Sequence, residues 1–139
     1  MLIVKTDADA AGGAFALVDL RAARGYETPY HVHYEEEEYF YVLDGEIERH
    51  YGDGESVVAG PRDTVFLPRD VPHGFRVVSD DSLRMLATVT PAGPEDFFVE
   101  GRDEAETRTL PPAAESDVES LVTAPRRTIL RSWVRCRSE

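Results

Sequence analysis

Short apolar segments alternate with turns from Ala14 to Val89. Within the segments, apolar residues tend to occupy every second position, as in strands with one face toward a core. Clusters of glycine, proline and aspartate separate the segments at intervals of about 8–12 residues, which is typical of an all-β sandwich or barrel. The pattern predicts strands over Ala14–Leu20, Tyr30–Tyr34, Tyr39–Leu43, Glu46–Tyr51, Ser56–Ala59, Thr64–Leu67, Gly74–Val78 and Leu83–Thr90.

Two turns in this region are marked by their residue types. Asp44-Gly45 lies between two predicted strands, and because both residue types accept positive φ angles, it predicts a tight hairpin. Gly52-Asp53-Gly54 predicts the next turn. Within Glu46–Tyr51, His50 shares one face with two glutamates, so we expect it to face solvent rather than to act as a ligand.

The pattern changes after Pro91 to that of short helices. A proline followed by acidic residues predicts a helix start at Pro94, and Ser116 predicts another helix that runs to about Val122. Residues 126–139 place four apolar side chains at helical spacing among five arginines. We therefore expect a barrel over residues 1–92 and a helical extension over 93–139 that packs on the barrel or on a partner subunit.

Length and charge limit the classes of function. With 139 residues, the chain is long enough for one domain and too short for two ordinary ones. Lysine and arginine number 15 against 27 acidic residues, a net charge of −12. Nucleic acids and anionic membranes both attract basic proteins, so neither is an expected partner.

The sequence also predicts the cellular compartment. The apolar run Leu2–Val4 is too short for a signal peptide, and no stretch approaches the roughly 18 apolar residues of a membrane span. Cys136 is the single cysteine, so no disulfide can form within the chain. We therefore expect a cytoplasmic protein.

One stretch of the chain combines residues that bind metals. His31 and His33 are two positions apart, which on a strand places both imidazoles on the same face, as a shared metal ion requires. Glu38 has the same parity as two apolar residues of its predicted strand, so we expect it to point into the core. A buried carboxylate needs a partner, and a metal ion is the obvious one.

A third histidine follows much later in the chain. His73 has the parity of Phe75 and Val77, so it too is expected to face inward. Three imidazoles and one carboxylate suit a divalent transition metal ion (Fe, Mn, Ni, Co, Cu or Zn), whereas calcium and magnesium prefer oxygen ligands alone. Within Glu35–Glu38, neighbouring side chains alternate between faces, so Glu35 and Glu37 are expected to be solvated.

These residues resemble the two motifs of the cupin family. The first motif is matched at every defined position by Gly25, His31, His33, Glu38 and Gly45. The second is matched by Pro68 and His73, whereas Arg62, Asp70 and Val77 stand where the family has two glycines and an asparagine. The stretch from Thr90 to Pro112 is similar to the tail of small cupins related to quercetin 2,3-dioxygenase.

The cupin resemblance implies a double-stranded β-helix, or jelly roll, over roughly residues 12–92. It implies a metal ion near one open end of the barrel, with His31, His33, Glu38 and His73 as its ligands. It also implies a homodimer, because family members commonly form one.

Three functions follow from such a site. Four protein ligands on a six-coordinate ion leave up to two positions open for substrate and dioxygen or water. The first prediction is a quercetinase-like dioxygenase that acts on a small aromatic or enolisable substrate, with Glu38 as the residue that takes the substrate's proton. The alternatives are a non-redox cyclase, isomerase or lyase, as in some polyketide pathways, and a metal- or ligand-binding protein without turnover.

Overall fold

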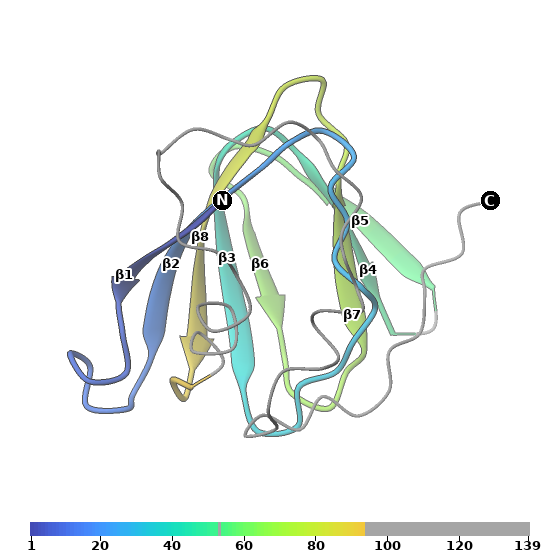
Figure 1. The fold of residues 1–139 in the computed structure, drawn as a ribbon. Helices are drawn as coiled ribbons and strands as arrows, with labels where there is room; N and C mark the ends of the chain where they lie inside the picture. Colours follow the sequence, from blue (N-terminus) through green and yellow to red (C-terminus); the bar gives the residue numbers. More distant parts are fainter. Residues whose placement is uncertain (53, 94–139) are drawn as a thin grey trace.

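The computed structural model describes residues 1–52 and 54–93. They form two antiparallel sheets that face each other (Figure 1). The larger sheet contains, in spatial order, β1 (Leu2–Thr6), β2 (Ala16–Ala22), β8 (Leu83–Thr90), β3 (Glu37–Asp44) and β6 (Thr64–Leu67). The smaller sheet contains β5 (Glu55–Ala59), β4 (Ile47–Tyr51) and β7 (His73–Val77). The all-β prediction is confirmed for this part of the chain.

Period-two alternation along the strands builds the core between the sheets. In β3, Phe40 and Val42 are buried, whereas Tyr39 and Tyr41 are exposed on the outer face. The same alternation recurs in β8, where every second residue is buried. Inward-facing apolar residues of both sheets form one cluster, whose largest members are Phe40, Ile47, Leu67, Phe75, Leu83 and Met85.

One predicted strand, Tyr30–Tyr34, is wrong. These residues form only isolated bridges, among them an antiparallel bridge between His31 and His73. The preceding Pro29 has no N–H to donate to a ladder, and the chain bends at Tyr34 before it enters β3. The segment is therefore held by individual backbone hydrogen bonds rather than by a ladder. His31 N–H donates to the His73 carbonyl (2.9 Å), His73 N–H donates back (2.8 Å), and Asp70 N–H donates to the His33 carbonyl (2.7 Å).

The structure adds a strand that the pattern did not predict. β1 pairs with β2 at the edge of the larger sheet, with Leu2 opposite Leu20 and Val4 opposite Val18. Its residues are only partly buried. An edge strand with incomplete burial shows little alternation, which is why the three-residue apolar run did not identify it.

Residues at sharp turns have positive φ angles. Gly45, at the predicted Asp44-Gly45 turn, has φ 78°. The prediction of a hairpin there is wrong, because β3 and β4 belong to different sheets and the turn leads from one sheet to the other. Arg62 (φ 75°) and Asp70 (φ 65°) also adopt left-handed backbone, at the two positions where the second cupin motif has glycines. The turns therefore keep the backbone shape of the motif although the glycines have been replaced.

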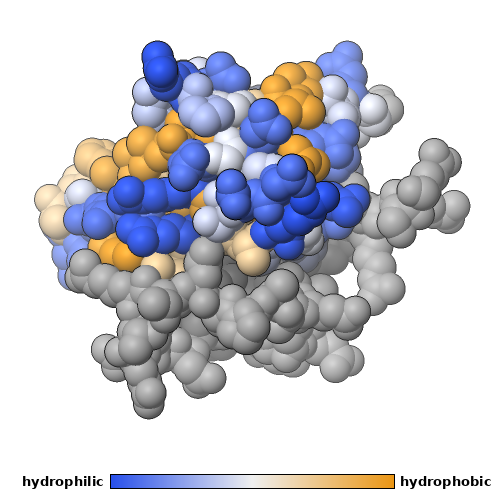
Figure 2. All heavy atoms as spheres, turned by 90° about the horizontal axis from the view of Figure 1, so that it is seen from above, coloured by the Kyte–Doolittle hydropathy of each residue, from blue (hydrophilic) through white to orange (hydrophobic). Residues whose placement is uncertain are grey.

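The two ends of the barrel differ in what they carry. The turn after β3 and the turn after β7 lie at one end, and Figure 2 shows the surface of that end as a mixture of hydrophilic and hydrophobic areas. The first residues of β3 and β7 lie at the other end. Glu38 and His73 are among these first residues. The candidate site is therefore at the end of the barrel opposite to the one that faces the viewer in Figure 2.

The predicted helices after Pro94 and the thiol of Cys136 lie outside the described residues. Among the described residues, no helix has the length and apolar character needed to cross a membrane.

Candidate metal centre

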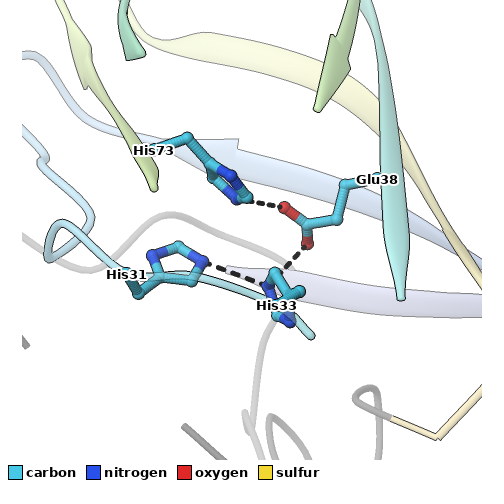
Figure 3. Close-up of side chains that lie close together, drawn as sticks. All are labelled: His31, His33, Glu38 and His73. Atoms are coloured by element: carbon cyan, nitrogen blue, oxygen red, sulfur yellow. Dashed lines mark hydrogen bonds and ion pairs between the residues drawn. The ribbon is translucent and has the colours of Figure 1, made fainter. Parts of the chain in front are cut away.

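Four side chains from three parts of the chain meet at one end of the barrel (Figure 3). Glu38 comes from the start of β3 and His73 from the start of β7, so the two sheets each supply one side chain. His31 and His33 come from the segment before β3, and the backbone bridge between His31 and His73 ties this segment to β7. Strand register and this bridge together fix the four positions.

The ligand atoms of the four residues converge. One such atom from each residue can be chosen so that all lie within 4.8 Å of one another. The Nε2 atoms of His31 and His33 are 3.1 Å apart. Glu38 places Oε2 3.3 Å from Nε2 of His73 and Oε1 3.8 Å from Nε2 of His33. All four side chains therefore direct a nitrogen or oxygen atom toward a common centre.

Backbone carbonyls fix the orientation of two of the imidazoles. Nδ1 of His31 donates to the carbonyl of Pro29 (2.7 Å), and Nδ1 of His73 donates to the carbonyl of Val71 (2.9 Å). Since a carbonyl only accepts, Nδ1 carries the hydrogen in both rings. In the neutral rings Nε2 then presents a lone pair to the centre, as a metal ligand must.

The converging lone pairs need a cation between them. Neutral His73 would direct a lone pair at the carboxylate of Glu38, and two acceptors 3.3 Å apart repel each other unless a positive charge intervenes. A divalent transition metal ion supplies this charge and accepts imidazole and carboxylate ligands together. The four residues fit such an ion, and the cluster is consistent with one metal ion.

His33 has a neighbour that the sequence interpretation missed. Its Nδ1 is buried and has no hydrogen-bond partner among the described residues, but it lies 3.6 Å from Oε2 of Glu36. A carboxylate beside the far nitrogen of a ligand histidine orients the ring and increases its basicity. Glu36 shares parity with Glu38, and this was the available signal in the sequence.

Burial and charge set the protonation states in the cluster. Burial lowers the pKa of His31 to about 4, although the charge of Glu38 opposes the shift. Without an ion, burial alone would raise the pKa of Glu38, but a hydrogen bond from His73 when its ring is protonated, and the positive charges of protonated histidines, lower it to about 2. At neutral pH, His31 is neutral and Glu38 is ionised, which are the states that bind metals.

The cluster is more accessible from one side. His33, Glu38 and His73 are buried, with exposed fractions of 5%, 7% and 1%, whereas His31 is only partly buried. His31 is therefore the most accessible of the four ligand residues.

The predicted orientation of each neighbouring acidic residue is confirmed. Glu37 points away from the centre and pairs with Arg69 (3.3 Å), and Glu35 is exposed. His50 lies on β4 and is absent from the cluster, as expected from its parity.

Comparison with known proteins agrees with the fold and the motifs. Residues 20–89 match the family model described as the cupin domain. None of the curated proteins matches the chain. Among solved structures, the polyketide cyclase RemF from Streptomyces resistomycificus is 29% identical with a TM-score of 0.59, covering 67% of this chain and 66% of that chain.

Two further structures show the same likeness. An RmlC-like cupin protein from Desulfovibrio desulfuricans is 27% identical with a TM-score of 0.55, covering 66% of this chain and 81% of that one. KdgF from Halomonas is 21% identical with a TM-score of 0.60, covering 68% of this chain and 81% of that one.

Proposed function

The chain belongs to the cupin family, and from this premise we propose that it is a metal-dependent enzyme acting on a small enolisable or phenolic substrate. The observation that carries the proposal is the convergence of four ligand atoms within 4.8 Å of one another. His31, His33, Glu38 and His73 would hold the ion. The ion would supply Lewis-acid polarisation of a substrate oxygen.

The protonation state of Glu38 limits the class of substrate from which it can remove a proton. Glu38 is ionised at neutral pH and can accept a proton, but a carboxylate is a weak base. A weak base removes protons efficiently only from an acidified group. An enol, a phenol or a carbon beside a carbonyl becomes acidic enough when the enol, phenol or carbonyl oxygen is polarised. Glu38 is therefore proposed as the residue that takes the substrate's proton.

We propose non-redox chemistry, such as cyclisation or isomerisation, as the leading reaction class. The 29% identity to the polyketide cyclase RemF supports this class. Proton transfer by Glu38 is sufficient for such a reaction, and it needs no oxidant.

The quercetinase-like dioxygenase predicted from the sequence is the second candidate. Three imidazoles and a carboxylate suit the redox-active metals iron, manganese, nickel and copper, and this donor set supports it. A dioxygenase consumes dioxygen in proportion to product, and a cyclase consumes none.

An oxygen-electrode screen of the purified, metal-loaded protein separates these functions. Flavonols, catechols and linear polyketide mimics are offered, and product is followed by mass spectrometry. We expect product without oxygen uptake. Uptake equal to product would establish the dioxygenase instead, and the absence of product with every compound would favour a binding protein without turnover.

A further inference from the structure

One charged side chain lies in the core-facing row of a strand. Along β4, the alternate residues Ile47, Arg49 and Tyr51 share the inward face, and Ile47 is fully buried. Arg49 pairs with Phe75 of β7, which is a core residue, and on its other side with Val57 of β5, which is 50% exposed. Arg49 therefore lies between the apolar core and an exposed edge strand.

The contacts of Arg49 do not neutralise its charge. Its guanidinium carbon lies 4.7 Å from the centroid of the Tyr51 ring, and Nη1 donates a long hydrogen bond (3.4 Å) to the carbonyl of Phe66. Nε is buried and has no hydrogen-bond partner. Across residues 1–52 and 54–93, no carboxylate forms an ion pair with this guanidinium.

Both contacts are with strands that pair with the strands of metal ligands. Tyr51 is the direct cross-strand partner of His73. Phe66 precedes Leu67, which is the cross-strand partner of Glu38. The guanidinium therefore contacts residues of β4 and β6, the strands that pair with the carriers of His73 and Glu38.

A partly buried cation without an anionic partner is unfavourable unless something else supplies the negative charge. The guanidinium group binds carboxylates with two parallel hydrogen bonds, and an unused Nε–H is one of the donors that such a pair requires.

We propose that Arg49 binds a carboxylate of the substrate, so that the substrate is a hydroxyaromatic or enolic carboxylic acid. The inference rests on the proposed function, because it takes the substrate's other oxygen to lie at the metal ligands.

If Arg49 only packs over the Tyr51 ring and has no part in binding, a different result is expected. In that case, replacing Arg49 changes stability but leaves the preference between charged and neutral ligands untouched. The preference for a carboxylate over its amide is therefore the informative measurement.

The test compares 4-hydroxybenzoate with 4-hydroxybenzamide, which differ in charge and hardly in shape. Binding of each to the zinc-loaded full-length protein is measured by isothermal titration calorimetry. We expect the carboxylate to bind at least about tenfold more tightly, the effect of one charged hydrogen-bonded pair. Equal affinity of the two compounds, or no detectable binding of the carboxylate, would overturn the proposal.

Variants assign the preference to Arg49. In Arg49→Gln the preference should disappear, and in Arg49→Lys, which keeps the charge, part of it should remain. Arg76→Gln removes a charge from the outer face of the same sheet and should change nothing. A preference that survives in Arg49→Gln would also overturn the proposal.

Metal analysis of the same samples separates this proposal from the proposed function. A carboxylate preference in a protein that takes up no metal would support the role of Arg49 and contradict the metalloenzyme. Stoichiometric metal without the carboxylate preference would support the metalloenzyme and contradict the role of Arg49.

Discussion

At the scale of single residues, Glu38 combines two roles that a substitution can separate. Three neutral imidazoles can hold a divalent ion alone, as three protein ligands do in many catalytic sites. We therefore expect Glu38→Gln to retain at least part of its metal. Because the amide removes the charge and the basicity, turnover on an identified substrate should fall by about 10²–10⁴-fold. Metal analysis and steady-state kinetics on one preparation measure both effects.

Glu37→Gln is the matched control for this prediction. It makes the same chemical change one residue away, on a side chain that faces outward and pairs with Arg69. Metal content and turnover should both equal those of the wild type. Full metal and unchanged turnover in Glu38→Gln would show that Glu38 is neither the base nor an essential ligand.

A second buried carboxylate serves stability rather than chemistry. Asp19 of β2 is fully buried and lies close to Arg84 (2.8 Å), Arg21 (3.4 Å) and Lys5 (3.9 Å). The hydrogen bond from Arg84 outweighs the effect of burial and holds the pKa of Asp19 below its ordinary value of 3.8. A lowered pKa in the folded state means that the charge on Asp19 stabilises the fold above about pH 4.

This pKa predicts the pH dependence of an Asp19→Asn variant. At pH 7, we expect its free energy of unfolding to be about 1–2 kcal/mol below that of the wild type, because a charged hydrogen-bonded pair is lost while its exposed partners stay solvated. The difference should shrink as pH falls below 4 through the pKa of the folded state, where Asp19 itself becomes neutral. Urea denaturation at several pH values measures it.

Asp80→Asn provides the control, because Asp80 pairs with Arg24 on the surface and its side chain is 92% exposed. That variant should match the wild type at every pH. A deficit of Asp19→Asn that stayed constant from pH 7 to pH 3 would contradict the assigned pKa direction.

Among the elements, the turn that leads from β3 in one sheet to β4 in the other depends on one glycine. Gly45 has φ 78°, and a Cβ atom placed on it would lie 2.8 Å from the carbonyl oxygen of Ser82 and 3.0 Å from the Cα atom of Leu83. Both are backbone atoms of the segment that leads into β8, so they cannot move aside cheaply. We expect Gly45→Ala to lower the free energy of unfolding by about 2–4 kcal/mol, measured by urea denaturation.

Gly12→Ala isolates the conformational part of this cost. Gly12 has φ 61°, but a Cβ atom there would meet nothing within 4 Å. The variant should therefore lose only about 1 kcal/mol, the strain of a left-handed alanine. Equal losses in the two variants would show that the contact with Ser82 and Leu83 does not matter.

The elements could be predicted where burial alternates and not elsewhere. Parity placed Glu38 and His73 inward because the strands that carry them have one buried face. The same rule failed for Tyr30–Tyr34, where isolated bridges and single backbone hydrogen bonds, rather than a ladder, hold the two histidines. Parity with Glu38 marks Glu36 as facing inward, but its position beside Nδ1 of His33 depends on the bend before β3, which no periodic pattern reports.

At the scale of the whole molecule, one sheet face is rich in exposed apolar side chains. Tyr39, Tyr41 and Leu43 of β3 and Phe66 of β6 are each 38–47% exposed, and the rings of Tyr39 and Phe66 lie 5.9 Å apart. Faces of this kind are usually covered in an assembly. We predict a homodimer, with twice the 15.5 kDa chain mass in sedimentation equilibrium at micromolar concentration. A mass of one chain would contradict this prediction.

The central claim is that His31, His33 and His73 hold one divalent ion together with Glu38. Anaerobic purification followed by elemental analysis of the wild type and of each histidine-to-alanine variant tests it most directly. His50→Ala serves as the control, since His50 lies outside the cluster. We expect about one ion per chain in the wild type and in His50→Ala, and a loss of most of the metal in the other three variants. Stoichiometric metal in all three would contradict it.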